Sequence, residues 1–279
     1  MILAPLRGVT IRCFRESYAE VLRDCGFVEA ITPFVSAMPG FDPMKDRELA
    51  GGCDKSGLKI TPQFIGKDPQ ALKYCLQRIK DAGYDTADLN CGCPFPMVRN
   101  KGRGSGILKT PDVLRRMLEA GCEVMGEGKF SVKARLGVGD SNELSRLIPL
   151  INEFPLRFLT VHGRIAKQMY DGISDMEAVK KIAAVSRNRV VFNGDLDWRD
   201  GKDMVGRSFI RYLGERDDSS ARLLDYVDAS RKELCGDRPV LGRVKELVAY
   251  WKDAPHWRKI WPILKIARNL DELALALRS

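Results

Sequence analysis

Short apolar runs alternate with amphipathic helical segments over roughly the first 200 residues of this chain. Such alternation is typical of a parallel sheet covered by helices. No glycine-rich dinucleotide fingerprint follows the first run, so the pattern favours an α/β fold of the (β/α)8 TIM-barrel type over a doubly wound sheet. The predicted strands are 2–4, 27–32, 58–65, 84–90, 129–136, 158–161 and 189–193, and the predicted helices are 12–24, 69–83, 113–120, 141–154 and 176–185.

An eighth strand is missing from this pattern. Only 13 positions lead from Asn193 to Gly206, whereas a return to a parallel strand takes a crossover of roughly a dozen residues. Either the chain lacks a helix and a strand here, or a segment has been left out between these residues. Because an open barrel wall would leave unpaired strand edges, we favour an omitted segment.

The pattern changes to helices alone after Arg207, with helices predicted at 219–235, 238–253, 255–267 and 271–277. From Pro239 onward, eight Lys and Arg residues stand against four Asp and Glu residues, and two tryptophans interleave with them. We therefore predict a barrel domain over 1–210 and a small all-helical domain over 211–279. By itself the basic tail fits a solvated helical cap as well as a nucleic-acid surface.

Charge and composition narrow the class of protein. A net charge of +9 and a pI near 9.2 indicate an anionic partner, either nucleic acid or a phosphorylated small molecule. Eight cysteines at irregular spacings and only two histidines indicate reduced thiols and no zinc site. No segment is long and apolar enough to span a membrane, so we expect a cytoplasmic protein without a metal.

The stretch from Ala87 to Lys109 joins a predicted strand to a loop that holds a thiol, glycines and cations. Cys93 follows the strand at its carboxyl end, where α/β folds place their sites. A thiolate nucleophile needs an adjacent base, and none is readable, whereas a protonated thiol acting as general acid needs only reach and orientation. A buried structural cysteine is the alternative. The cations Arg99, Lys101 and Arg103 could bind an anion or merely be solvated.

Polar residues stand at the ends of five consecutive predicted strands, and in a barrel they would converge on one face. Lys133 has apolar neighbours, so it needs an anionic or electron-rich partner to offset its desolvation, and a cofactor would provide one. Gly206 and Arg207 lie where barrels commonly bind phosphate. The strand-end residues are Gln63, Asn90 with Cys93, Lys133 with Arg135, His162 with Arg164, and Asn193 with Asp195.

Seven motifs in order make the chain resemble the tRNA-dihydrouridine synthases, flavin-dependent enzymes that reduce uridine in tRNA. The sequence N-C-G-C-P is most similar to one bacterial branch of that family. Two departures are Leu6, where methionine is more usual, and the short interval after Asp195. The motifs are L-A-P-L-R-G-V-T at 3–10, D-L-N-C-G-C-P at 88–94, K-G-R-G-S-G at 101–106, V-K-A-R-L-G at 132–137, T-V-H-G-R at 160–164, N-G-D at 193–195 and V-G-R at 205–207.

The resemblance implies a role for each matched residue. Cys93 would protonate uracil C5 after hydride from FMN, itself reduced first by NADPH, reaches C6. The implied FMN contacts are Pro5 and Leu6 beside the flavin, Gln63, Lys133 and His162 at its ring, and Asn193, Asp195, Gly206 and Arg207 at the ribityl and phosphate end. The implied substrate contacts are Asn90, Arg135 and Gln168 in the uracil pocket, with Arg99, Lys101 and Arg103 near RNA phosphate.

The resemblance also implies that the helical tail binds tRNA and that the target base leaves its stack to enter the barrel. We expect a monomer. Two other interpretations stay open. An FMN barrel that reduces a free pyrimidine or a small enone would need the same thiol and phosphate site but no basic tail. A tRNA-binding relative that has lost catalysis would be colourless when purified.

Overall fold

The computed structural model describes residues 1–52, 54–201 and 203–278. Its strands are β1 (Ile2–Leu3), β2 (Glu29–Ile31), β3 (Val35–Ser36), β4 (Lys59–Thr61), β5 (Gln63–Ile65), β6 (Ala87–Cys91), β7 (Phe130–Gly137), β8 (Leu159–Ile165), β9 (Val190–Asn193) and β10 (Met204–Val205). Its helices are α1 (Arg12–Ser17), α2 (Ala19–Asp24), α3 (Pro69–Asp81), α4 (Pro96–Arg99), α5 (Pro111–Met125), α6 (Glu143–Ile151), α7 (Met176–Val185), α8 (Arg207–Glu215), α9 (Ser219–Glu233), α10 (Asp237–Val248), α11 (Pro255–Ile266) and α12 (Leu270–Arg278). Among the described helices, none combines the length and hydropathy that a membrane span requires.

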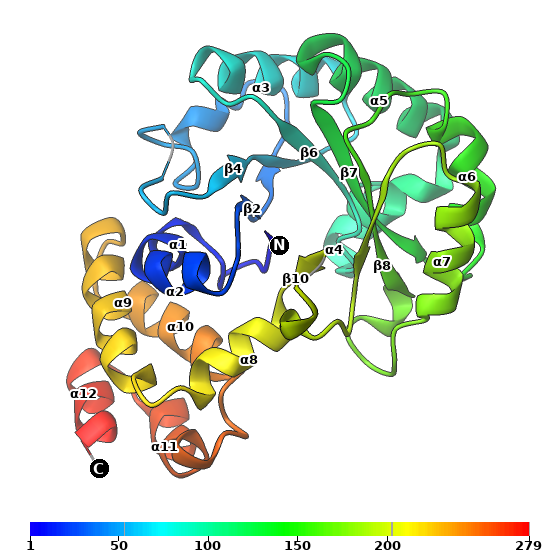
Figure 1. Ribbon diagram of the computed structural model, residues 1–279. Helices are drawn as coiled ribbons and strands as arrows, with labels where there is room; N and C mark the ends of the chain where they lie inside the picture. Colours follow the sequence, from blue (N-terminus) through cyan, green and yellow to red (C-terminus); the bar gives the residue numbers. More distant parts are fainter. Residues whose placement is uncertain (53, 202, 279) are drawn as a thin grey trace.

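The strands form a parallel barrel surrounded by helices, which confirms the predicted fold (Figure 1). One sheet has the order β10-β1-β2-β4, and the other has the order β3-β5-β6-β7-β8-β9. The predicted strand 58–65 is broken at Pro62, which cannot donate a backbone hydrogen bond, so β4 pairs with β2 while β5 pairs with β3 and β6. At Pro62 the barrel wall therefore changes from the first sheet to the second.

The interval after Asn193 contains the eighth strand, so no omitted segment is needed to explain it. A 3-10 turn, η4 (Trp198–Asp200), replaces the crossover helix, and β10 pairs with β1 in parallel. Asn193 Nδ2 donates to Met204 O at 2.9 Å across the join of β9 and β10. Trp198 packs on Phe209 of α8, where a longer crossover would otherwise cover the wall. The eighth strand that the pattern lacked is therefore β10, and the favoured explanation by an omitted segment is not needed because one turn suffices.

Local sequence signals account for most helix ends, and packing accounts for the differences. Asp68 caps α3 by accepting from Gln70 N and Ala71 N, with proline at the first turn as predicted. The helix predicted at 113–120 is longer in the structure, where it is α5. Gly121 lies inside α5 and so close to the Phe130 ring that a Cβ would collide with it, so this glycine allows packing and does not end the helix. The helix predicted at 12–24 is two helices that meet at Tyr18.

The chain leaves the barrel through α8 and continues as the predicted helices of the tail. Val240, Val244, Leu247 and Val248 lie on one face of α10 and are buried. Trp251, just after α10, donates from Nε1 to Ile210 O of α8 at 2.7 Å. The tail packs against the barrel through α9, which lies beside α1 (Figure 1). The boundary predicted between residues 210 and 211 falls inside α8, and the division into two domains stays a prediction.

Candidate functional site

A cleft that encloses about 780 Å³ of space, part of it open to solvent, lies at the carboxyl end of the barrel strands. Eleven of the residues predicted for the site line it, which places the thiol of Cys93 in the same cleft as Lys133 and His162. The lining residues are Ala4, Pro5, Leu6, Arg7, Pro33, Phe34, Gln63, Asn90, Gly92, Cys93, Pro94, Phe95, Lys133, Arg135, His162, Tyr170, Asn193, Gly194, Gly206 and Arg207.

Cys93 lies just beyond β6 and is held by its backbone. Its N–H donates to Asn90 Oδ1 at 2.8 Å, and its carbonyl accepts from Ser105 N at 3.1 Å and from Ser105 Oγ at 2.9 Å. The side chain is 6% exposed, and burial raises the pKa of the thiol while the charges of Arg7 and Arg135 lower it. A raised pKa keeps the thiol protonated near neutral pH, which suits a proton donor.

A chain of hydrogen bonds carries this loop back into the barrel. Asn90 Nδ2 donates to Gln63 Oε1 at 2.8 Å, Gln63 Nε2 donates to Asp88 Oδ2 at 2.7 Å, and Ser131 Oγ donates to Asp88 Oδ1 at 2.6 Å. Burial raises the pKa of Asp88 to about 6, although both of these donors lower it. Because every link is buried, the chain fixes the amide orientations of Gln63 and Asn90.

Positive charge in the cleft is only partly compensated. Lys133 Nζ donates to Asn193 Oδ1 at 2.9 Å, and burial lowers the pKa of Lys133 to about 8. Arg135 donates to the carbonyl oxygens of Gly92, Ile165 and Met169, and burial lowers its pKa to about 10. Neither cation forms an ion pair with a carboxylate of the described residues. The cleft therefore favours a ligand that carries negative charge.

His162 is neutral in this environment. Burial and then the charge of Lys133 lower its pKa well below the ordinary value. Arg164 NH1 lies 3.2 Å from His162 Nε2, and since a guanidinium can only donate, Nε2 must accept. The ring proton therefore lies on Nδ1. His162 can offer one N–H to a ligand without adding a charge.

The amino end of α8 closes the cleft and meets a second hollow, since both are lined by Gly194 and Arg207. Burial raises the pKa of Asp195, but the hydrogen bond from Arg164 outweighs burial and the pKa is lowered. Arg207 NH2 donates to the same carboxylate at 3.0 Å. Among the described residues, Ser208 Oγ is buried there without a partner. A helix terminus, an arginine and an orphaned hydroxyl fit the phosphate of a flavin nucleotide.

The structure does not bring every predicted site residue into the cleft. Asp195 lines the second hollow instead. Gln168 turns its amide oxygen to Ile165 N at 2.9 Å. Arg99, Lys101 and Arg103 are also absent from the cleft lining, and Arg103 NH1 contacts Met38 Sδ at 3.6 Å. None of these five residues lines the cleft, and their roles stay predictions.

Sequence reasoning missed the aromatic walls of the cleft and one cation. Tyr170 lies with Arg135 Cζ 5.3 Å and Arg207 Cζ 5.0 Å from its ring centroid, so two guanidinium groups contact one ring. Opposite elements contribute Phe34, Phe95 and Arg7. The available signals were position alone: Arg7 adjoins Leu6, and Tyr170 follows the H-G-R motif on the same connection.

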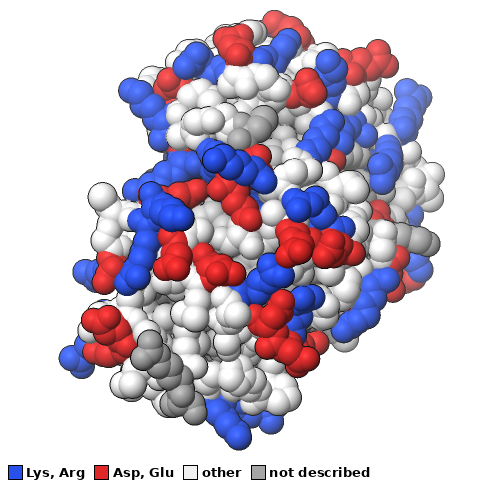
Figure 2. All heavy atoms as spheres, turned by 60° about the vertical axis from the view of Figure 1, so that its left-hand side comes forward, with Lys and Arg blue, Asp and Glu red and all other residues white. Residues whose placement is uncertain are grey.

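Two arginines of the helical region outside the cleft have acidic partners. Arg222 pairs with Glu20 at 3.0 Å between α9 and α2, and Arg216 pairs with Asp218 at 2.8 Å. Figure 2, which brings the left-hand side of Figure 1 forward, shows cationic and acidic groups intermingled on that face. Within the described ranges, His, Cys, Asp and Glu side chains form no cluster that could hold a metal ion, and the seven described cysteines are free; Cys53 lies outside the described residues.

Comparisons with known proteins agree on one family. The profile of the dihydrouridine synthases (Dus) matches residues 2–208. The chain is 32% identical over 219 residues to the tRNA-dihydrouridine(16) synthase of Haemophilus influenzae, covering 75% of this chain and 69% of that protein. It is 29% identical over 201 residues to tRNA-dihydrouridine synthase B of Vibrio vulnificus, covering 71% of this chain but only 60% of that protein.

Among solved structures, the old yellow enzyme homologue from Zymomonas mobilis has a TM-score of 0.52 at 13% identity, over 76% of this chain and 85% of that one. At this identity the likeness concerns the fold, a TIM barrel. The family profile covers the whole barrel, including the thiol, the cleft cations and the start of α8. The chain therefore belongs to the dihydrouridine synthase family.

Proposed function

We propose that this protein reduces a uridine of tRNA to 5,6-dihydrouridine, with FMN as cofactor and NADPH as reductant. The observation that carries the proposal is the shared cleft: a buried thiol with a raised pKa lines it together with a half-buried lysine and a neutral histidine. The relatives named tRNA-dihydrouridine synthases support the substrate. Bound FMN supplies the hydride for uracil C6, after NADPH has supplied its electrons.

Cys93 donates its proton to uracil C5 and regains one from water afterwards. Its backbone is fixed by Asn90 and Ser105, so the sulfur keeps one position relative to the cleft floor. Asn90 and Arg135 lie next to it and bind the polar edge of the uracil. Their own orientations are set by Gln63 and by the carbonyls of Gly92 and Met169.

Lys133, Gln63 and His162 hold the flavin ring, with Pro5 and Leu6 at its edge. The ammonium of Lys133, which lacks a carboxylate partner among the described residues, stabilises negative charge on the ring. Asn193, Gly206 and Arg207 hold the ribityl and phosphate end, with Asp195 positioning Arg207 and Ser208 as a further donor. The RNA contacts the helical tail over 211–279 and the cations Arg99, Lys101 and Arg103.

The test uses the whole purified protein with FMN, NADPH and an unmodified tRNA transcript. Nucleoside mass spectrometry should detect dihydrouridine in proportion to the NADPH consumed. Turnover of free uracil or a small enone without any action on tRNA would instead identify a small-molecule reductase. A protein that binds tRNA but no flavin would be a non-catalytic relative, and either result overturns the proposal.

A further inference from the structure

Four cations line the cleft, and one of them has no polar partner. Lys133, Arg135 and Arg207 each donate to an oxygen of the protein. Arg7 also lines the cleft, yet no described residue accepts a hydrogen bond from its guanidinium or pairs with it. Among the described residues, its guanidinium contacts the Phe34 ring, with Cζ 5.2 Å from the centroid. Five N–H donors are therefore presented at the cleft without an acceptor from the protein.

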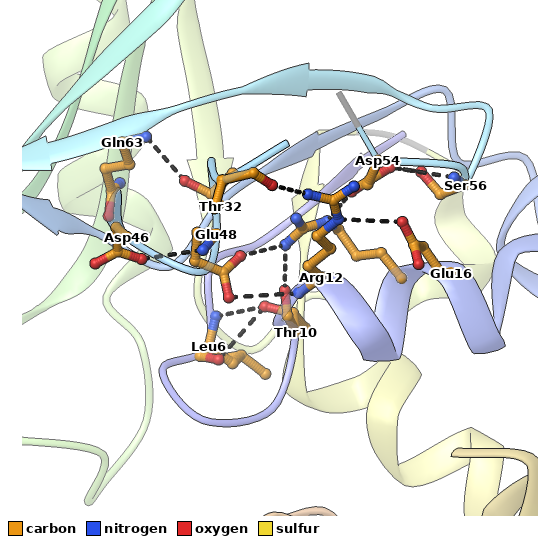
Figure 3. Close-up of polar contacts among 12 residues, drawn as sticks. Leu6, Thr10, Arg12, Glu16, Thr32, Asp46, Glu48, Asp54, Ser56 and Gln63 are labelled. Carbon is orange, nitrogen blue, oxygen red and sulfur yellow. Dashed lines mark hydrogen bonds and ion pairs between the residues drawn. The ribbon is translucent and has the colours of Figure 1, made fainter. Parts of the chain in front are cut away.

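Hydrogen bonds hold the turn that carries Arg7 in place. Leu6 N donates to Thr10 Oγ1 at 2.8 Å (Figure 3). Thr10 Oγ1 in turn donates to Ala4 O at 3.1 Å. The buried Arg15 donates to Thr10 O at 2.8 Å and is itself neutralised by Glu48 and Asp54. The network fixes the backbone at Arg7 while the side chain stays exposed. Such a preorganised cation suits ligand binding.

Arg7 also lies where the barrel mouth meets the helical tail. The next residue, Gly8, has φ +83°, and a Cβ there would collide with Glu246 of α10 and lie 2.6 Å from Arg243 NH1. On its other side Arg7 is close enough to Cys93 for its charge to act on the thiol. Arg7 therefore lies between α10 of the tail and the thiol in the cleft.

We propose that Arg7 binds the RNA backbone phosphate that flanks the nucleotide inserted into the cleft. This inference rests on the proposed function and names a substrate contact for it. A guanidinium stacked on Phe34 offers paired N–H donors to a phosphate in a fixed plane. Arg103 NH1 contacts Met38 Sδ at 3.6 Å, and Met38 follows Phe34 by four positions on the segment that Arg7 also contacts. The exposed position favours the RNA backbone over a small reductant seated in the cleft.

The test compares Arg7→Gln with Arg189→Gln, which removes the same charge from an exposed side chain at the amino end of β9. Binding of unmodified tRNA is measured against salt concentration. We expect Arg7→Gln to weaken binding about tenfold at low salt and to reduce the log–log salt slope by about 0.7 to 0.9, the value for one phosphate. Arg189→Gln should leave both unchanged, and Arg7→Lys should restore the slope.

Reduction of the bound flavin by NADPH without RNA is measured on the same variants. An unchanged rate in Arg7→Gln supports the inference. A slowed rate with normal tRNA binding would assign Arg7 to the reductant and overturn it, as would wild-type binding and slope in Arg7→Gln. Equal flavin content and equal urea midpoints exclude misfolding as the cause of weak binding.

The two proposals fail separately. If the wild-type protein binds tRNA in an Arg7-dependent way but forms no dihydrouridine, the phosphate contact stands and the proposed reaction falls. If the wild-type protein forms dihydrouridine and Arg7→Gln binds and reacts equally well, only the inference about Arg7 is overturned.

Discussion

The two ends of the barrel treat buried charge differently. At the amino end, Arg157 donates to both oxygens of Glu29, at 2.5 and 2.7 Å, and Thr61 Oγ1 donates to the same carboxylate at 2.6 Å. At the carboxyl end, Lys133 and Arg135 meet only neutral oxygens. The charge of Arg157 at the amino end is thus neutralised within the protein. The charges of Lys133 and Arg135 at the carboxyl end have no counter-ion among the described residues, so they can attract a negatively charged ligand.

This difference separates stability from function in one cylinder. A buried ion pair with all its hydrogen bonds satisfied is costly to break, because one charge is left behind without a partner. A buried cation without a counter-ion already costs the folded protein free energy, and the cost is offset when an anion binds. Substitutions at the amino end should therefore lower stability, and substitutions at the carboxyl end should lower activity.

The largest expected effect is the loss of activity in Cys93→Ala. Removal of a general acid should slow dihydrouridine formation by about 10² to 10⁴, while flavin content and tRNA affinity stay unchanged. Single-turnover assays with saturating tRNA measure the rate. Cys91→Ala, at the end of β6 two residues before Cys93 but outside the cleft, is the control and should react at nearly the wild-type rate. Equal rates in the two variants would assign the proton donor elsewhere.

The next largest effect is a loss of stability in Arg157→Met. Glu29 is 4% exposed, so removal of its partner should lower the unfolding free energy by on the order of 3 kcal/mol. Urea unfolding monitored by circular dichroism measures the change. The double variant Glu29→Gln with Arg157→Met should recover part of the loss. A single variant as stable as the wild type would show that solvent, rather than Arg157, compensates the carboxylate.

A smaller effect concerns pH and Lys133. Its folded pKa of about 8 lies below the ordinary 10.5, so the unfolded chain holds this proton more tightly. The resulting penalty is fully present below pH 8 and disappears as the pH rises to 10.5. In the flavin-free protein, the unfolding free energy of the wild type should therefore rise relative to that of Lys133→Met across this window. A difference that does not change with pH would contradict the lowered pKa.

Prediction from the sequence succeeded where the signal was local. Alternating apolar runs indicated the barrel, and Asp68-Pro69 marked the start of α3, because capping and periodicity act over a few neighbouring residues. Prediction failed at the eighth strand, where the short interval suggested an omitted segment. The decisive fact there is a pairing of β10 with β1, which lies at the far end of the sequence.

Prediction of the site followed the same division. The motifs placed Cys93, Lys133 and His162 at strand ends, and the strand register brings them to one cleft. Arg7 stands in the motif L-A-P-L-R-G-V-T beside Leu6, but the motif assigned it no role. What distinguishes it is the lack of an acceptor, and that follows only from where every other residue lies.

The sequence by itself determined the alternation of elements, the chemistry of the strand ends and the excess of positive charge. The tertiary structure decided which charges are neutralised by a partner in the protein and which are left available for a ligand. The physical reason is that a pKa or an ion pair depends on burial and on partners within a few ångströms. Such a partner can lie far away along the chain: Glu29 and Arg157 are 128 positions apart.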